Sequence, residues 1–183
     1  MEILEAAEIA KELTKEVISD ITEIQTLNLE QLKSRNDGLE TPFEQIETRN
    51  QHLEGKVHPE TGVPFERKVV ENDQGHLVEG VFAKFESKFD AQLPENLYKE
   101  TDRKQFDYAN RELGENIKEN KELRETFNER QLEQIKHGKT PEGFTWHHSE
   151  ESGKLELVDA ETHVKTGHTG GRFIWGGGTE MRA

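Results

Sequence analysis

The chain has 183 residues, of which 31% are hydrophobic, 34% are charged and none is cysteine, and its formal net charge is −14 at pH 7. This length predicts one domain with an appendage, and the absence of cysteine excludes disulfides, thiolate zinc sites and thiol catalysis. The apolar fraction lies below the roughly 45–50% of globular domains, so we expect part of the chain to lie outside any packed core.

The charge and the short apolar runs exclude further classes of function. No run is long enough for a membrane-spanning segment, and the N-terminus lacks the basic and apolar regions of a secretory signal. The 38 acidic residues against 24 Lys and Arg argue against nonspecific binding to DNA or RNA. A nucleic-acid site in this chain would therefore have to rest on a metal ion and a small local patch.

The first 36 residues carry an apolar stripe. Hydrophobic residues recur at three- and four-residue steps from Ile3 to Ile24, which predicts an amphipathic helix. Residues 37–57 are polar and favour a linker. We therefore expect an N-terminal helix and linker over residues 1–57, followed by a single domain over residues 58–183.

The next segment combines a hairpin with helices. Residues 67–71 and 76–82 flank the turn sequence Asn-Asp-Gln-Gly and predict a β-hairpin. A long polar helix is expected after Pro94, with shorter helices around 121–127 and 129–137. These helices have few apolar positions, so we place them on a surface.

The last segment predicts the order strand, turn, strand, helix. Strands are expected at 144–148 and 155–158, followed by a short helix that Asp159 begins as its N-cap and Gly167 ends. Trp146 is expected in the core beneath the hairpin. The glycine-rich tail 170–178 carries three large apolar residues and is expected to fold back onto the core.

Four of the eight histidines lie close together in this last segment: His147, His148, His163 and His168. Imidazole suits zinc and other first-row divalent ions, and three protein ligands with one open position are typical of a catalytic site. His147, His163 and His168 could supply these ligands. His148 would then be available as a general base, because its ordinary pKa lies near neutrality.

Geometry sets two conditions on this site. Neighbouring side chains on a strand point to opposite faces, so His147 and His148 diverge unless the strand bulges. His163 and His168 share a face only if the helix ends between them, near Gly167. Arg172 follows two glycines and is a candidate phosphate contact, since a guanidinium group matches phosphate with two hydrogen bonds.

Two other hypotheses remain open from the residues alone. The histidines could hold a structural zinc ion in a binding module whose acidic surface docks a protein partner. Alternatively, the chain could be a helical adaptor whose function lies in residues 1–36.

The motif residues carry a resemblance to a known group of nucleases. Residues 145–148 (Thr-Trp-His-His), the strand Leu-Glu-Leu-Val at 155–158, His163, and Gly-His-Thr-Gly-Gly at 167–171 resemble the WHH group of the HNH/endonuclease VII superfamily. The segment from His58 to Gly143 also resembles the C-terminal toxin domains of LXG-type polymorphic toxins of Gram-positive bacteria.

This resemblance implies an α+β fold with a ββα-metal (HNH/His-Me finger) core at about 143–178, to which further helices, a β-hairpin and the N-terminal helix are added. It implies that His148 is the general base and that His147 and His163 are ligands of one divalent metal ion, either Zn, Mg, Mn or Ni. His168 is implied as a further ligand or phosphate contact. In the wider superfamily an Asn near the start of the second strand supports the base, and Lys154 stands at that place here.

The resemblance also implies a biological role. Such domains cleave DNA or RNA in a competitor cell as part of a larger secreted toxin, and DNA is the favoured substrate here. The producing cell holds the toxin in its cytoplasm bound to an immunity protein, often of the SUKH type.

Overall fold

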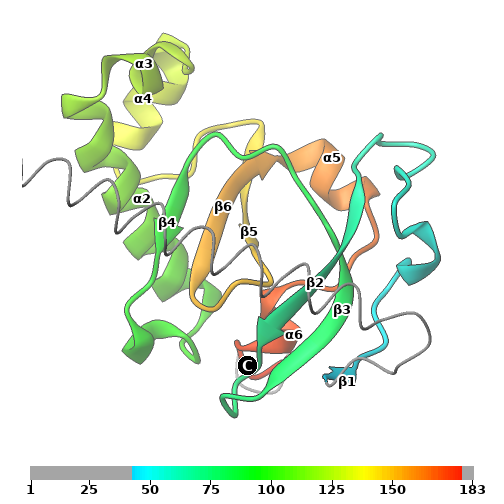
Figure 1. Ribbon diagram of the computed structural model, residues 1–183. Coiled ribbons are helices and arrows are strands. Elements are labelled where there is room, and N and C mark those ends of the chain that lie inside the picture. Colours follow the sequence, from blue (N-terminus) through cyan, green and yellow to red (C-terminus); the bar gives the residue numbers. More distant parts are fainter. Residues whose placement is uncertain (1–42, 179–183) are drawn as a thin grey trace, which may run out of the picture. The chain divides into compact units, whose positions relative to one another are not determined.

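The structure is a computed structural model that describes residues 43–178, so the predicted N-terminal helix lies outside the described residues. The described residues all lie in one compact unit. Its described part contains two three-stranded sheets and several helices (Figure 1), which confirms the predicted α+β class. Within residues 43–178, the helices are too short or too polar to cross a membrane.

The first sheet has the strand order β1-β3-β2 and contains the predicted hairpin. Strands β2 (Phe65–Glu71) and β3 (Leu77–Ala83) pair antiparallel, from Phe65 opposite Ala83 to Glu71 opposite Leu77. The turn forms because Asn72 Oδ1 accepts hydrogen bonds from the backbone of Gln74 and His76, each 3.0 Å long.

Strand β1 (Glu44–Gln45) pairs parallel with β3, and a 3-10 turn, η1 (Gln51–Leu53), follows it. Both lie in the segment for which the sequence predicts a polar linker. The compact unit thus begins at Phe43, ahead of the boundary expected at residue 57.

The second sheet has the order β4-β6-β5 and positions the histidine motif. Strand β5 (Phe144–His148) pairs antiparallel with β6 (Lys154–Asp159), and β4 (Asp90–Gln92) pairs with the other edge of β6. Helix α5 (Ala160–Lys165) follows β6 directly, and the Asp159 carboxylate caps it by accepting a 2.7 Å bond from the Thr162 N–H. Strand, strand and helix thus follow in the predicted order.

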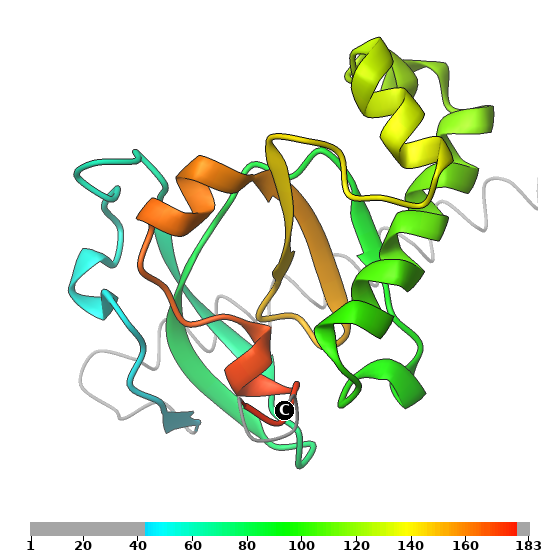
Figure 2. The ribbon, with the colours of Figure 1, turned by 180° about the vertical axis from the view of Figure 1, so that it is seen from behind.

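Three helices form a group at one end of the unit (Figure 2). Helix α2 (Asp102–Glu119) follows a 3-10 turn, η2 (Glu95–Leu97), and is followed by α3 (Lys121–Glu125) and α4 (Glu129–Lys136). These helices match the predicted order, although α2 begins later than Pro94 because Thr101 caps it.

One apolar core joins both sheets to α2. Its buried members include Val78 and Phe82 of the first sheet, Leu155 of the second sheet, and Leu113 of α2. The last helix, α6 (Gly171–Ile174), closes this core, since Ile174 and Trp175 are buried in it. The glycine-rich tail therefore folds back onto the core as expected, which brings its residues next to β5.

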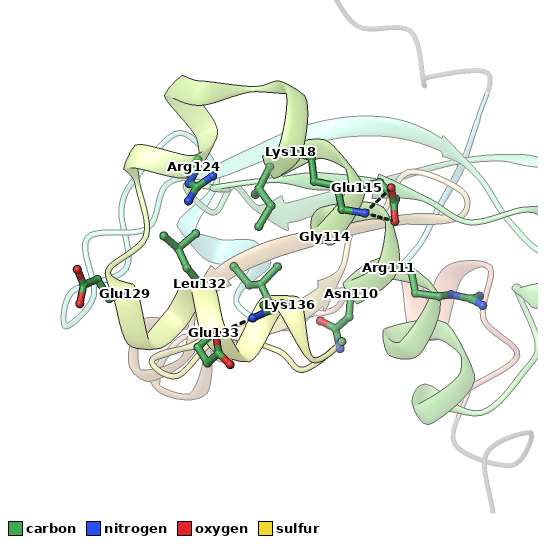
Figure 3. Close-up of a pocket in the computed structure, with 13 residues that line it drawn as sticks. Asn110, Arg111, Gly114, Glu115, Lys118, Arg124, Glu129, Leu132, Glu133 and Lys136 are labelled. Carbon is green, nitrogen blue, oxygen red and sulfur yellow. Dashed lines mark hydrogen bonds and ion pairs between the residues drawn. The ribbon is translucent and has the colours of Figure 1, made fainter.

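A cavity of about 660 Å³ lies between α2, α3 and α4. Figure 3 shows charged side chains along it, with Lys118 paired to Glu115 and Lys136 paired to Glu133. No histidine lines this cavity, so it is separate from the histidine site.

Candidate metal centre

The structure brings together three of the predicted site residues: His147 at the end of β5, His163 on α5, and His168 in the segment after α5. One nitrogen from each ring lies within 4.8 Å of the others. His147 Nδ1 is 3.2 Å from both His163 Nε2 and His168 Nε2. We call these three residues the histidine triad.

The triad has the dimensions of a metal site. Zinc–nitrogen bonds of about 2.0–2.1 Å in a tetrahedral site place the ligand nitrogens about 3.3 Å apart, close to the observed spacing. The Nδ1 of His168 is 2.6 Å from the Thr166 carbonyl oxygen. Because a carbonyl only accepts, Nδ1 carries the proton and the lone pair of His168 lies on Nε2, toward the other two rings. The triad can therefore bind a metal ion.

Local structure explains why the rings converge. Helix α5 ends at Lys165, with Thr166 as its C-cap in an extended conformation, so the chain turns before His168 and the helical period no longer separates it from His163. The triad then packs against Phe85, whose ring centroid lies 4.8, 5.3 and 4.9 Å from those of His147, His163 and His168. This phenylalanine forms an apolar wall of the site.

Burial keeps the triad neutral. It lowers the pKa of His147 well below the ordinary value, with the other three histidines adding to the effect, and lowers that of His163 to about 4, with His168 as the second cause. The pKa of His168 is also lowered, first by burial and further by the positive charge of Arg49. At neutral pH the three lone pairs are available to a metal without loss of protons.

The fourth histidine lies apart from the triad. The register of β5 and β6 is regular, with His147 opposite Glu156 and His148 opposite Leu155, so their side chains point to opposite faces as the alternation predicts. His148 is buried, and its Nε2 lies 2.7 Å from Gln105 Oε1 on α2. The ring of His148 is thus held by a hydrogen bond to α2 and not by the triad.

Lys154 takes no part in this hydrogen bond. It forms ion pairs of 3.2 Å with Asp90 on the adjoining strand β4 and with Glu156 on its own strand β6. The group that contacts the ring of His148 comes instead from α2, far upstream in the chain.

Two arginines lie near the histidines. Arg172 on α6 forms an ion pair with Asp102, the first residue of α2. Arg49 lies beside the segment that carries His168: a Cβ atom added at Gly167 would be 2.5 Å from Arg49 Nε. Asn50 holds this contact in place because its side-chain amide donates a 2.7 Å bond to the Gly167 carbonyl.

Glycines in the motif allow close backbone approach. A Cβ atom at Gly170 would lie 2.6 Å from the His148 carbonyl oxygen and 3.1 Å from His147 Cε1, and one at Gly171 would collide with the Ser149 carbonyl and the Trp175 ring. Gly167 has an ordinary negative φ, since it is not among the left-handed glycines. Helix α5 nevertheless ends just before Gly167, as expected, with Thr166 as its C-cap. The absence of a side chain at Gly167 makes room for Arg49.

Trp146 is buried in the core beneath β5, and its indole Nε1 donates a 2.9 Å hydrogen bond to Asn110 Oδ1 of α2. Sequence reasoning missed three residues of the site: Phe85, Arg49 and Gln105. A signal for Gln105 was present, because it lies four and eight residues before the buried Ala109 and Leu113 on the same helical stripe.

One comparison with known proteins bears on this site. The family model of the DNase/tRNase domain of colicin-like bacteriocins matches residues 74–170, more than half of the chain. No curated protein and no solved structure matches the chain. The matched residues include all four clustered histidines and Gln105 but neither Arg49 nor Arg172. The chain therefore belongs to the family of DNase/tRNase domains of colicin-like bacteriocins, which makes it a nuclease toxin domain.

Proposed function

We propose that the chain is a metal-dependent endonuclease toxin that hydrolyses phosphodiester bonds in nucleic acid, with DNA favoured over RNA. The observation that carries this proposal is the convergence of three neutral imidazoles on one point, with His148 held separately on the next residue of the same strand. A catalytic metal site with a nearby base needs this division of roles.

The ligands of one divalent ion would be His147, His163 and His168. Zn, Mg, Mn and Ni are all candidates, and three imidazoles favour the metals that prefer nitrogen ligands. When bound, the ion would supply Lewis-acid stabilisation of the charge that develops on the scissile phosphate and the leaving oxygen.

The chain's own residues would perform the remaining steps. His148 takes a proton from the attacking water as the water oxygen bonds to phosphorus and the bond to the leaving oxygen breaks. Phe85 packs against the triad rings on one side and fixes their orientation.

Arg49 is our first candidate for the phosphate contact. Its side chain is exposed and adjacent to His168, and its positive charge already acts on that ring. Arg172 is the second candidate. Its pairing with Asp102 places it beside the support of His148, so a phosphate contact there would have to compete with a carboxylate.

The proposal includes a place for this chain in a larger toxin. We assign the nuclease domain to residues 58–183, with its WHH-type HNH core at about 143–178, and add to it residues 43–57, which belong to the same compact unit and carry β1 and Arg49. We propose an LXG-type polymorphic toxin used in interbacterial competition. It would be secreted to act in the target-cell cytoplasm and held by an immunity protein, of the SUKH type, in the producer.

The alternative of a structural-metal module, which docks a partner through its acidic surface, predicts a closed site with four histidine ligands. The position of His148 favours the nuclease, because its Nε2 faces Gln105 on α2 and the ring lies between Phe106 and Trp175.

The test is a cleavage assay on both substrates. Purified chain is incubated with supercoiled plasmid DNA and with total RNA, in EDTA or with added Mg²⁺, Mn²⁺, Ni²⁺ or Zn²⁺. We expect metal-dependent cleavage, with DNA cut faster than RNA. Cleavage of neither polymer by folded, metal-loaded chain would refute the proposal, and faster cleavage of RNA would reverse the substrate preference.

A further inference from the structure

Gln105 is a fully buried polar residue on α2 whose amide is completely oriented by its surroundings. Its side chain is 0% exposed. Its Nε2 donates to the carbonyl oxygens of Leu97 and Tyr98, at 2.7 and 2.9 Å. The reversed amide would place an oxygen against two oxygens that can only accept, so Oε1 must be the atom that faces His148.

This orientation determines the tautomer of His148. An amide oxygen can only accept a hydrogen bond, so the His148 Nε2 that lies 2.7 Å from it must carry the hydrogen. In a neutral imidazole the other nitrogen, Nδ1, then has the lone pair. The Asp102 carboxylate also lies near Nε2, at 3.8 Å, and as an acceptor it favours the same tautomer.

Two aromatic side chains fix the plane of the His148 ring. Phe106, the residue after Gln105, and Trp175 both pack on the ring of His148, with centroid distances of 5.6 and 5.7 Å. Asp102, Gln105 and Phe106 are spaced at three and four residues on α2, so one face of its first turns surrounds the base.

We propose that Gln105 is a positioning residue for the nuclease reaction: it holds His148 in the Nε2–H tautomer, so that Nδ1 is the atom that accepts the proton of the attacking water. The inference rests on the proposed function for its catalytic meaning. The hydrogen bond itself does not depend on that function, and the experiment separates the two.

The experiment compares wild type with Gln105→Leu, which removes the acceptor, and Gln105→Glu, which keeps an acceptor toward His148 but loses the donor to the Leu97 and Tyr98 carbonyls. Asn110→Leu is the matched control, because Asn110 is another buried amide on α2 but bonds to Trp146 and Thr140. Long-range ¹H–¹⁵N spectra of the zinc-loaded chain at pH about 8 report the tautomer of His148, whose signals are assigned by their loss in His148→Ala. Cleavage rates at saturating metal and substrate give kcat.

We expect wild type, Gln105→Glu and Asn110→Leu to show the Nε2–H form, and Gln105→Leu to show a mixture of both tautomers. We also expect kcat to fall about 10- to 100-fold in Gln105→Leu, the usual effect of losing the hydrogen-bond partner of a functional histidine, with KM and zinc affinity unchanged. Asn110→Leu should retain the wild-type kcat.

Three results would overturn the inference: an Nδ1–H signal in wild type, an unchanged tautomer and kcat in Gln105→Leu, or an equal loss of kcat in Asn110→Leu. The wild-type spectrum decides the tautomer of His148 even if neither Gln105 variant folds. A wild-type chain that cleaves nothing would instead refute the proposed function and the catalytic role of Gln105, while the spectra would still report the hydrogen bond.

Discussion

His163 shows how much of the candidate site depends on single side chains. It comes from α5, whereas His147 comes from β5, and the two nitrogens meet at 3.2 Å only because Asp159 starts the helix directly after β6. The triad supplies three ligands, so the loss of one leaves two, which is too few for a stable catalytic site.

Replacing His163 with Ala is therefore expected to lower the affinity for zinc by more than about 100-fold, as measured by calorimetric titration of the metal-free chain. His76→Ala is the control, because this exposed histidine lies in the turn of the β2–β3 hairpin. Equal zinc affinity in wild type and His163→Ala would show that the triad does not hold the metal.

The neutral state of the triad also predicts how the stability of the metal-free chain depends on pH. The pKa of His163 is about 4 in the folded chain and about 6.5 when unfolded, so the unfolded state binds more protons between these values. Stability is thus fully present above about pH 6.5 and is lost as the pH falls toward 4.

This loss should be smaller in a His163→Gln variant, which has no titrating ring. Urea unfolding of both proteins at pH 7.5, 6 and 5 measures it, and the advantage of wild type over the variant should decrease at each step. A constant difference across this range would mean that burial does not depress the pKa of His163.

At the scale of elements, the site depends on close backbone contact between short segments, above all between β5 and α6. The Gly170–Gly171 pair lets the start of α6 lie against the end of β5, where any side chain at Gly171 meets the Ser149 carbonyl and Trp175. Gly114 differs, because it lies inside α2 and an added Cβ would be an ordinary 3.6 Å from the Ile135 carbonyl.

Two alanine substitutions should therefore have opposite effects. Gly171→Ala is expected to lower the free energy of unfolding by about 1–3 kcal/mol through overpacking. Gly114→Ala should raise it by about 0.5–1 kcal/mol, because alanine loses less backbone entropy in a helix. Chemical denaturation measures both values, and a stabilised Gly171→Ala variant would contradict the close approach seen at β5.

Features of the fold that have local signals could be predicted from the sequence, and features that depend on tertiary contacts could not. The hairpins, α5 and the gathering of His147, His163 and His168 could be predicted, because turn residues, a capping aspartate and histidine spacing are local signals. Tertiary contacts account for what was missed. Gln105 lies in a helix that is mostly polar and therefore looked solvated, although it is fully buried.

Arg49 was missed for a similar reason. Its segment has few hydrophobic residues and was interpreted as a linker, yet β1 pairs with β3, Ile46 packs on the core, and the buried Thr48 donates a 2.7 Å bond to the Val81 carbonyl. Backbone pairing, one buried hydroxyl and isolated apolar contacts hold such a segment in place, and none of these leaves a periodic apolar pattern in the sequence.

For the whole molecule, the net charge of −14 is consistent with the proposed function only if attraction to phosphate is local. A divalent ion bound by the neutral triad, together with Arg49, would concentrate positive charge at one place on an acidic protein. The negative charge also predicts that the chain binds nucleic acid weakly away from the site, since binding along the phosphate backbone needs many Lys and Arg contacts.

The most direct test of the central claim compares plasmid DNA cleavage by wild type and His148→Ala at equal, measured metal occupancy. Because His148 lies outside the triad, the variant should bind zinc as wild type does, and its cleavage rate should fall about 100- to 10,000-fold, the range of general-base catalysis. Full cleavage by metal-loaded His148→Ala would contradict the account, because the base and the metal ligands would then not be the residues that the structure separates.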